Sequence, residues 1–369
     1  MGNPTGGPTS SLRHRAKVPA QLRTRMGEPR RRDERTVVIT GASRGLGFAS
    51  AVRLYREGWR VVAAMRTPGE CAALLREAAG ATDDDDRLVC VQLDLMDTAS
   101  VAAAAKLIEE AVGAPYALVH NAGISAAGVV EETDIELWQK MFATHVMGPV
   151  ALTKALLPAM RAAGRGRIVL VSSAGGVRGQ PAIAPYSAAK GALERWGESM
   201  AGEIAPFGLG VTVLVTGTYD TDIITDAGTT DDRNFEGPYA RIHATMNTRG
   251  RFAMRLARPP ERFTDGLVKA LADEKPFRRR GVGPDASMLL MFNRILPAAG
   301  MHHMSRLVMG IPRQGAMTDG AYPLTTAQKA MVFAAKVLPE PVLMRLVSLA
   351  TRLTPTKEEP RQEGSANDA

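Results

Sequence analysis

A tyrosine, a lysine and a serine occur at spacings that could support proton transfer. Tyr186 and Lys190 are four residues apart, so on a helix both side chains lie on one face. A phenol with a pKa of ~10 is a poor base at neutral pH, but a nearby cation favours the phenolate. Ser173 follows an apolar run and supplies a hydroxyl that can orient a substrate oxygen. These residues are candidates for acid–base exchange with an alcohol or a carbonyl.

A glycine-rich turn follows the first apolar run of the chain. After residues 37–39 the sequence reads Thr-Gly-Ala-Ser-Arg-Gly-Leu-Gly, and a helical pattern continues from there. Glycines let the backbone approach a pyrophosphate, and the N-terminus of the helix offers unpaired N–H donors. The spacing G-x-x-x-G-x-G differs from the commoner dinucleotide fingerprint. The turn therefore predicts a nucleotide phosphate site formed by Gly41, Ser43, Arg44, Leu46 and Gly47.

Further motifs follow in a fixed order. They are Asp-Leu at 94–95, His-Asn-Ala-Gly at 120–123, the serine at 173 and Tyr-x-x-x-Lys at 186–190. With this ordered set the chain resembles the short-chain dehydrogenase/reductase family over residues 36–285. The resemblance implies additional cofactor contacts at Asp94, Leu95, Asn121, Ala122, Gly123, Tyr186, Lys190, Gly217 and Thr221.

The resemblance also implies the roles of the catalytic residues. Tyr186 would be the general acid/base, Lys190 would lower its pKa and hold the nicotinamide ribose, and Ser173 would orient the substrate oxygen. His120 replaces the first asparagine of the family's Asn-Asn-Ala-Gly motif, and His145 replaces the asparagine of its proton relay. A histidine has an ordinary pKa of ~6.5, so we expect that His145 either takes over the relay or makes the enzyme slower.

The residues after the second apolar run bear on the choice of cofactor. A site that prefers NAD(H) needs a carboxylate about 20 residues after the glycines, to hold the ribose 2′-hydroxyl. Met65 and Arg66 occupy this place. Arg66 and Arg44 could instead pair with a 2′-phosphate, because the planar guanidinium group suits phosphate. NADP(H) is therefore the predicted cofactor, NAD(H) remains an alternative, and two solvated arginines are the simplest other interpretation.

The elements that must position these residues alternate along the chain. Short apolar runs at 37–39, 61–62, 88–93, 117–119, 168–171 and 211–215 are separated by helical patterns, one of which is a long helix near 135–160. This alternation predicts an α/β fold, a Rossmann-type doubly wound parallel sheet with helices on both faces. A mobile lid is expected at about 218–258, and a last strand around 281–282. A helical C-terminal extension is expected at 286–355, before a disordered tail at 356–369.

Composition limits the classes of protein to which this chain can belong. Hydrophobic residues make up 45% and charged residues 23% of the chain, as in globular proteins. Aromatic residues make up only 5%, which disfavours single-stranded nucleic acid as a partner. Much of the net charge of +8 lies in residues 1–35, with nine basic and three acidic residues, and this segment is expected to be a disordered tail. It is interpreted as a solvated leader, and an electrostatic tether is the alternative.

Two cysteines, Cys71 and Cys90, cannot form a disulfide framework, and no metal site is predicted. The sequence shows neither a signal peptide nor an uninterrupted apolar stretch of the ~18 residues that a membrane span needs. A cytoplasmic protein is therefore expected. The apolar, Lys/Arg-flanked helices after residue 285 are also compatible with peripheral membrane contact. Packing within the chain, or in a homodimer or homotetramer, explains these helices equally well.

The substrate is predicted from a shorter resemblance. Residues 276–285 resemble the stretch that follows the lid in hydroxysteroid and retinol dehydrogenases. This implies a bulky apolar alcohol or carbonyl compound that is steroid-, retinoid- or lipid-like. The alternative function is a catalytically silent dinucleotide-binding sensor or scaffold. The intact set Ser173, Tyr186 and Lys190 argues against this alternative, and His145 argues for it.

Overall fold

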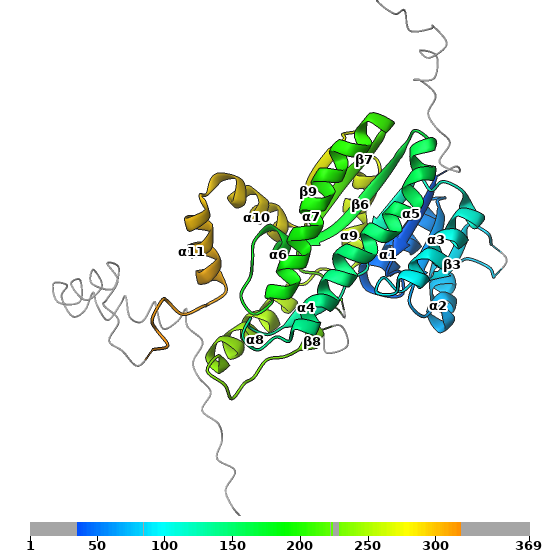
Figure 1. The fold of residues 1–369 in the computed structure, drawn as a ribbon. Coiled ribbons are helices and arrows are strands. Elements are labelled where there is room, and N and C mark those ends of the chain that lie inside the picture. Colours follow the sequence, from blue (N-terminus) through cyan, green and yellow to red (C-terminus); the bar gives the residue numbers. More distant parts are fainter. Residues whose placement is uncertain (1–34, 84, 222, 224–228, 319–369) are drawn as a thin grey trace, which may run out of the picture. The chain divides into compact units, whose positions relative to one another are not determined.

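The computed structural model describes residues 35–83, 85–221, 223 and 229–318 (Figure 1). The expected basic tail before residue 35, the extension after residue 318 and the last polar segment lie outside the described residues. The chain divides into two compact units, of which the first ends at Ile311. The second begins at Pro312 and is described only as far as Thr318.

The first unit is built on a seven-stranded sheet with the order β3-β2-β1-β4-β6-β7-β9 (Figure 1). Every pair of neighbouring strands in it is parallel. The predicted doubly wound parallel fold is therefore confirmed. The strands are β1 (Thr36–Thr40), β2 (Arg60–Met65), β3 (Leu88–Gln92), β4 (Ala117–His120), β6 (Gly166–Ser173), β7 (Leu209–Thr216) and β9 (Phe277–Val282).

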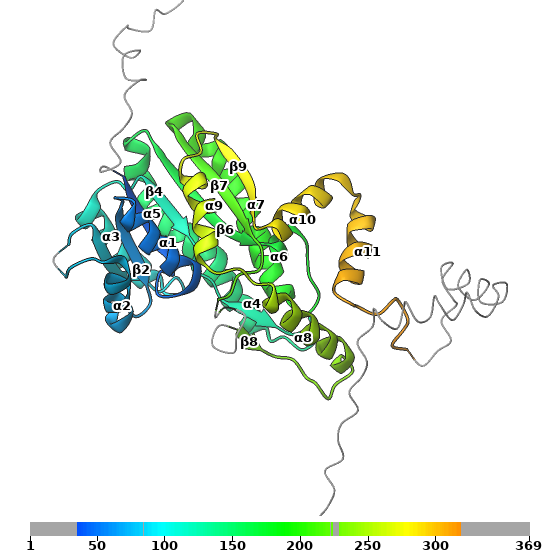
Figure 2. The ribbon, with the colours of Figure 1, turned by 180° about the vertical axis from the view of Figure 1, so that it is seen from behind.

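Helices cover both faces of this sheet, as the two opposite views show (Figures 1 and 2). One buried cluster joins α3, α5 and α7 to the sheet, and another joins α1, α2 and α9 to its other face. Alternate residues of β1 divide between the clusters, since Val38 belongs to the first and both Val37 and Ile39 to the second. Burial on both faces explains why the strands are almost uninterrupted apolar runs.

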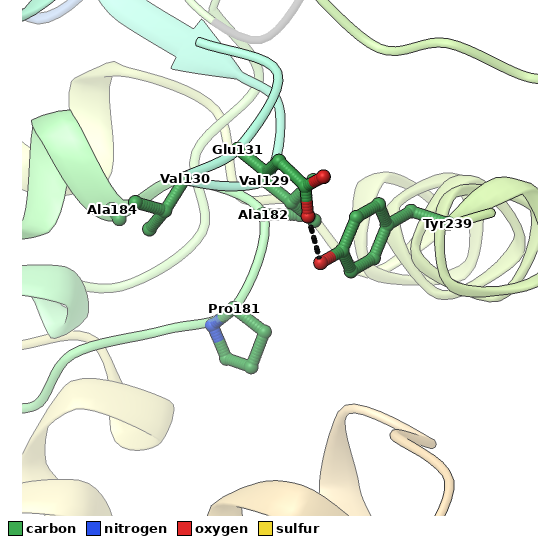
Figure 3. Close-up of a pocket in the computed structure, with 7 residues that line it drawn as sticks. All are labelled: Val129, Val130, Glu131, Pro181, Ala182, Ala184 and Tyr239. Atoms are coloured by element: carbon green, nitrogen blue, oxygen red, sulfur yellow. Dashed lines mark hydrogen bonds between the residues drawn. The ribbon is translucent and has the colours of Figure 1, made fainter. Parts of the chain in front are cut away.

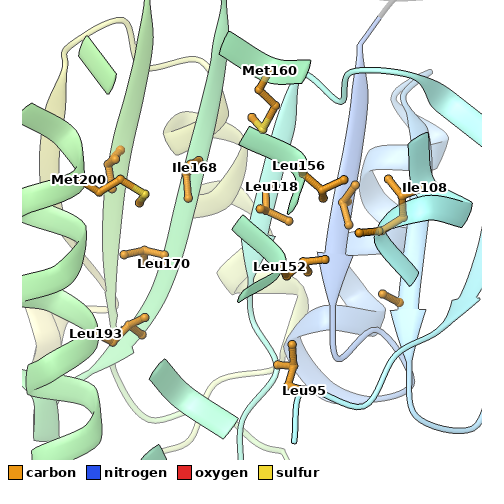
Figure 4. Packing of buried hydrophobic residues seen from close by; sticks show 14 of the residues in the cluster. Leu95, Ile108, Leu118, Leu152, Leu156, Met160, Ile168, Leu170, Leu193 and Met200 are labelled. Atoms are coloured by element: carbon orange, nitrogen blue, oxygen red, sulfur yellow. The ribbon is translucent and has the colours of Figure 1, made fainter. Parts of the chain in front are cut away.

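Aliphatic side chains fill the first cluster (Figure 4). Leu152 and Leu156 of α5 are fully buried against Leu118 of β4 and Ile168 of β6. Full burial of one such side chain contributes roughly 1.5–3 kcal/mol. The helices are α1 (Gly45–Arg56), α2 (Gly69–Ala79), α3 (Thr98–Val112), α4 (Ile135–Phe142), α5 (Gly148–Ala162), α6 (Ala174–Val177), α7 (Ala184–Ile204), α8 (Ala240–Arg255), α9 (Glu261–Leu271), α10 (Pro284–Ile295) and α11 (Ala298–Val308).

The order of the strands creates a switch point at the carboxyl ends of β1 and β4. From β1 the chain winds through β2 and β3 to one edge of the sheet, and from β4 it winds through β6 and β7 to the other. Ligands of open α/β sheets bind at such a switch point. The glycine turn follows β1 and the Asn-Ala-Gly stretch follows β4, so the fold brings both motifs to this place.

Several elements differ from those predicted. The long helix expected near 135–160 is α4 and α5 joined by a π-helical turn, η3 (Ala143–Met147). The segment at about 218–258, expected to be a mobile lid, contains the short strand β8 (Thr229–Asp231) and the 16-residue helix α8. Strand β8 pairs with β5 (Ser125–Ala127) in a separate two-stranded sheet. Helix α8 was missed because arginine, threonine and asparagine are interspersed among its few large apolar residues.

The last strand of the sheet begins earlier than the sequence predicted. Strand β9 starts at Phe277 and includes the basic run 278–280, which was expected to precede the strand. The arginines fit there because Arg279 pairs with Glu194, and Arg280 with Asp273. The predicted domain boundary at 285 falls within α10, which begins at Pro284. The other domain bounds remain predictions.

Candidate functional site

The glycine turn after β1 leaves no room for a side chain at position 41 or 47. Gly41 has a φ of +69°, and a Cβ there would lie 2.7 Å from the Cα of Ala122. A Cβ on Gly47 would lie 2.2 Å from the carbonyl oxygen of Gly41 and 2.5 Å from Nδ2 of Asn121. Cβ atoms essentially never approach other atoms to less than 3.0 Å. The two glycines therefore let the turn pack tightly against the end of β4 at the N-terminus of α1, where backbone amides can bind a phosphate.

Thr40 and Asn121 hold this turn against the end of β4. The Thr40 hydroxyl accepts hydrogen bonds from the amides of Asn121, at 3.1 Å, and Ala122, at 3.0 Å. In return, the Asn121 side-chain amide donates to the carbonyls of Thr40, at 3.0 Å, and Gly41, at 3.2 Å. Asn121 therefore shapes the glycine turn from the neighbouring strand. The remaining expected residues of the turn are partly buried, namely Ser43 and Leu46.

Two exposed arginines flank the turn. Arg44 is the N-cap residue of α1, and its side chain makes no capping hydrogen bond. Arg66 directly follows β2. The amides of Gly41 and Ala42 donate to the carbonyl of Ala64, at 2.8 and 3.2 Å, which keeps the end of β2 beside the glycine turn. Arg44 thus belongs to the turn, and Arg66 follows the strand end that lies beside it.

Two segments from later in the chain also reach the turn. The methyl group of Thr221 lies 3.2 Å from the position that a Cβ on Gly45 would take. Gly217 instead lies under Asp285 of α10, whose Oδ1 would be 1.9 Å from a Cβ on that glycine. The same carboxylate accepts a hydrogen bond of 2.8 Å from the amide of Thr218. The structure thus brings Thr221 to the glycine turn and fixes Gly217 through α10.

The Asp-Leu pair follows β3 at the same edge of the sheet. Oδ1 of Asp94 accepts a hydrogen bond of 2.9 Å from the amide of Met96, which fixes the carboxylate above its own turn. Leu95 is buried against Gly148, where a Cβ would lie 2.3 Å from the Leu95 carbonyl oxygen. Asp94 therefore lies at the carboxyl end of β3, and the cofactor contact that the resemblance implies for it stays a prediction. Leu95 serves the packing of α5.

The three expected catalytic side chains meet at the end of β6. Ser173 ends this strand, and Tyr186 and Lys190 lie one turn apart on α7. The hydroxyls of Ser173 and Tyr186 are hydrogen-bonded to each other. Lys190 is only 4% exposed, and its Nζ donates to the Val171 carbonyl at 2.8 Å. The strand end and the helix thus hold a phenol, an alcohol and an amine next to one another.

Burial controls the acid–base properties of this group. It raises the pKa of Tyr186, and the hydrogen bond with Ser173 lowers that pKa by less. The pKa of Lys190 is lowered to about 7, because burial penalises its ammonium more than Glu194 favours it. The expected lowering of the Tyr186 pKa by Lys190 is not found. The Lys190 Nζ lies 5.7 Å from the tyrosine ring centroid and donates to Val171 instead.

His145 lies beside the same tyrosine. The π-helical turn η3 carries it, and its ring meets the Tyr186 ring edge-on at 5.5 Å and 89°. Nε2 donates to the Ile124 carbonyl at 2.9 Å, which leaves Nδ1 as an acceptor. Among the described residues this buried Nδ1 has no hydrogen-bond partner. The expected titration near 6.5 is wrong, because burial first and Lys190 second lower the pKa well below that value.

His120 has a different environment, although it also replaces a family asparagine. It is 2% exposed and lies in the core, where its Nε2 is 2.8 Å from the Thr153 hydroxyl. Its ring packs edge-on against Trp196. Burial lowers its pKa to about 3, so the ring is neutral at physiological pH. His120 therefore supports β4 and α5 and does not face the catalytic group.

The segment after β4 links the glycine turn to the catalytic group. Ala122 contacts Gly41 on one side. On the other side a Cβ on Gly123 would lie only 2.8 Å from Cε1 of His145. The motif that follows β4 is therefore in van der Waals contact with both halves of the site. A side chain at position 123 would therefore overlap with the ring of His145.

A cavity of about 410 Å³ opens beside the N-terminus of α7 (Figure 3). Tyr239, in the segment before α8, lines this cavity, and its hydroxyl donates a hydrogen bond of 2.5 Å to the carboxylate of Glu131, another lining residue. Ala182 lines it with a φ of +62°, a conformation that residues other than glycine rarely adopt. The sequence pattern indicated none of these residues, because they come from separate loops without a motif. The wall consists of Val129, Val130, Glu131, Pro181, Ala182, Ala184 and Tyr239.

A charged pair behind Lys190 was also missed. Glu194 is 2% exposed and pairs with Arg279 of β9. It also accepts a hydrogen bond of 2.6 Å from the Ser172 hydroxyl. The only sequence signal for it is the spacing of four residues from Lys190, which places both side chains on one face of α7.

Comparisons with known proteins agree with this arrangement. The family model for short chain dehydrogenases matches residues 35–232. The chain is 31% identical to the oxidoreductase YusZ of Bacillus subtilis over 273 residues, which cover 72% of this chain and 95% of YusZ. It is 34% identical to the mouse dehydrogenase/reductase SDR family member 7B over 200 residues, covering 54% of this chain and 62% of that protein.

A solved structure is also similar to this chain. A short-chain dehydrogenase from Streptomyces avermitilis matches it with a TM-score of 0.64 and 29% sequence identity. The match covers 75% of this chain and 98% of the Streptomyces chain. Within the described residues, none of the helices is both long and apolar enough to cross a membrane.

Proposed function

The chain belongs to the short-chain dehydrogenase family, and on this premise we propose that it reduces carbonyls to alcohols, or the reverse, with NADP(H). As a member of this family it is an oxidoreductase that acts on CH–OH groups with NAD(P). The finer assignment to NADP(H), and to a bulky apolar substrate with a primary or secondary alcohol, is our proposal. The observation that carries it is the clustering of Ser173, Tyr186 and Lys190 at the end of β6, the strand next to β4 of the switch point.

The residues around the glycine turn fit a dinucleotide. Gly41 and Gly47 accept no Cβ, so the turn between β1 and α1 is compact, and the N-terminus of α1 that follows it would bind the phosphates through its backbone amides. Arg44 and Arg66 would hold the 2′-phosphate, since the segment after β2 offers an exposed guanidinium where NAD(H) needs a carboxylate. When bound, the nicotinamide supplies or accepts the hydride.

The proton is handled by residues of this chain. In the direction of reduction the Tyr186 hydroxyl donates its proton to the carbonyl oxygen, and Ser173 orients that oxygen. The raised pKa of Tyr186 keeps its hydroxyl protonated at neutral pH, which suits the role of a general acid. We assign to Lys190 the role of favouring the phenolate that remains, which requires its ammonium to turn from the Val171 carbonyl towards Tyr186. We assign to His145 the relay role of the family asparagine, with its unpartnered Nδ1 as the acceptor.

The cavity beside α7 supports an apolar substrate. Its wall is formed largely by valine, alanine and proline, with Glu131 and Tyr239 as the polar exceptions. Apolar walls with a few placed polar groups are typical of small-molecule sites. Ala184, one of the lining residues, begins α7, the helix that also carries Tyr186, although Tyr186 itself does not line the cavity.

A panel of carbonyl compounds tests this function. Purified full-length protein is mixed with NADPH and with steroid ketones, retinal, long-chain aldehydes and small soluble ketones. We expect NADPH consumption with at least one bulky apolar compound and none with the Tyr186→Phe variant. If no compound consumes NADPH, or if Tyr186→Phe retains wild-type turnover, the proposed function is wrong. Turnover only with small soluble ketones would retain the reaction and refute the apolar substrate.

Exposed apolar side chains on α10 and α11 favour contact with a membrane surface as part of this function. Exposed helices that carry apolar and basic side chains together suit a lipid interface. Flotation of the full chain with vesicles that contain anionic lipid tests this contact, and protein that stays at the bottom of the gradient would contradict it. The exposed residues include Met288 at 53%, Met291 at 51%, Ile295 at 68%, Leu307 at 56% and Val308 at 59%.

A further inference from the structure

One face of helix α7 makes polar contacts with three consecutive residues at the end of β6. Tyr186 is hydrogen-bonded to Ser173, and Lys190 donates to the Val171 carbonyl at 2.8 Å. Glu194, four residues further along, accepts from the hydroxyl of Ser172 at 2.6 Å. Residues spaced by four lie on the same face of a helix. Glu194 therefore belongs to the same interface as the two catalytic side chains of α7.

The carboxylate of Glu194 is enclosed on every side. It is 2% exposed, and its second oxygen pairs with Arg279 of β9. Helix α6 closes the remaining side at Gly176, where a Cβ would lie 2.5 Å from Oγ of Ser172 and 2.7 Å from Oε1 of Glu194. A buried carboxylate is costly unless it is paired and hydrogen-bonded, and here both conditions are met. Such a group has a fixed position.

We propose that Glu194 is a positioning residue for the catalytic lysine, and that Arg279 adjusts the negative charge that Lys190 experiences. Ser172 and Ser173 are adjacent in β6, so the bond from Ser172 to Glu194 also fixes the strand end that carries Ser173. This inference rests on the proposed function, because it assigns Glu194 a role only if Lys190 acts in catalysis. Nothing in it requires Glu194 to touch the substrate or the cofactor.

The charges around Lys190 determine in which direction each substitution should change its pKa. Glu194 raises the pKa of Lys190 against the effect of burial, which lowers it to about 7. The other titratable groups that face the amine are Tyr186 on its own helix and His145 on η3, and Arg279 acts on it through Glu194. Loss of the carboxylate should let the pKa of Lys190 fall further, so that the ammonium is lost at lower pH. Loss of Arg279 should leave the carboxylate uncompensated and have the opposite effect.

The experiment measures the pH dependence of kcat/KM for carbonyl reduction with NADPH, using the substrate found in the panel. For Glu194→Gln we expect the basic limb of the profile to move to lower pH by roughly one unit, and for Arg279→Met we expect it to move to higher pH. Opposite movements in two variants of one ion pair cannot result from a general loss of structure. Glu194→Asp keeps the charge and should restore the wild-type limb, even where its shorter side chain lowers kcat.

Two matched variants separate charge from packing. Ser172→Ala removes the hydrogen bond to Glu194 but keeps its charge, so it should lower kcat without moving the limb. Glu203→Gln removes an exposed carboxylate from the same helix and should change neither. NADPH binding, followed by its fluorescence, confirms that each variant is folded. If Glu194→Gln does not fold, the upward shift in Arg279→Met carries the test.

The proposal and the proposed function fail in different ways. If Tyr186→Phe retains turnover, the catalytic assignment is wrong whatever Glu194 does. If Tyr186→Phe is inactive while folded Glu194→Gln and Arg279→Met keep the wild-type basic limb, the catalytic assignment stands and the role of Glu194 is refuted. Movement of the limb in the same direction in both variants would also refute it, because the two charges are opposite.

Discussion

Gly47→Ala is the sharpest test of the glycine turn. The new methyl carbon would lie 2.2 Å from the Gly41 carbonyl oxygen and 2.5 Å from Nδ2 of Asn121, both below the 3.0 Å that Cβ atoms keep. The first of these atoms is backbone, and the second is fixed by its hydrogen bonds to the carbonyls of Thr40 and Gly41. The overlap can be relieved only if the N-terminus of α1 moves away from the end of β1.

Overpacking of this kind costs about 1–3 kcal/mol, which lowers the Tm of a domain of this size by roughly 2–4 °C per kcal/mol. The same movement opens the phosphate cradle, so we expect the Kd for NADPH to rise more than about tenfold, the equivalent of ~1.4 kcal/mol. Calorimetry gives the Tm, and fluorescence titration gives the Kd. The two effects should occur together, because one displacement causes both.

Gly202→Ala is the matched control. Gly202 is an exposed glycine inside helix α7, and a Cβ there meets nothing within 4 Å. Alanine is favoured over glycine in a helix by about 1 kcal/mol, so this variant should be slightly more stable and bind NADPH as the wild type does. Wild-type affinity for NADPH in Gly47→Ala would refute the argument, since it would mean that the close approach at Gly41 does not shape the cofactor site.

Three further predictions follow from the geometry. Arg66→Asp should weaken NADPH binding at least about tenfold while NADH binding changes little, and titration with both cofactors checks this. Between pH 7 and pH 5 the unfolded chain protonates His120, whose folded pKa is about 3, so this residue alone should cost the wild type about 2 kcal/mol of stability, in addition to the loss from His145. The loss begins below the unfolded pKa of ~6.5 and should be reduced in His120→Asn, as denaturation at both pH values would show. Burial alone would raise the pKa of Asp273, but hydrogen bonds from Arg280 and the Lys275 amide lower it. Its contribution is therefore present above about pH 4 and lost below, and Asp273→Asn should cost about 3–5 kcal/mol in urea unfolding at pH 7, because Arg167 loses its buried partner.

The sequence predicted the sheet because its strands are buried on both faces. A continuous apolar run such as 168–171 has few alternatives once it lies between two helical patterns. The expected catalytic group could be found because Tyr186 and Lys190 are close in sequence, and a spacing of four fixes their geometry on a helix. Their roles stay predictions, but their proximity to Ser173 follows from the order of the strands.

Contacts between distant segments could not be predicted in the same way. The last strand was expected only around 281–282, whereas the basic run 278–280 also lies within it, and Arg279 pairs with Glu194, 85 residues earlier. The sequence also predicted a lowered pKa for Tyr186, whereas burial raises it. The spacing shows that Lys190 is near the tyrosine, but it does not show that the amine donates to the Val171 carbonyl. Burial and competing acceptors are properties of the folded chain.

The two histidines that replace family asparagines illustrate why residue type alone does not identify a site. His120 and His145 are both buried and neutral, and burial lowers the pKa of each. His120 is accommodated by the hydroxyl of Thr153, in the core between β4 and α5. His145 is accommodated by the missing side chain of Gly123 and faces Tyr186. A ring that needs a glycine opposite it can be replaced by a smaller asparagine without strain, whereas a side chain at 123 would displace His145 from the tyrosine. The position of the His145 ring therefore depends on the glycine at 123. A substitution at 123 should impair proton transfer more than it lowers the stability of the fold.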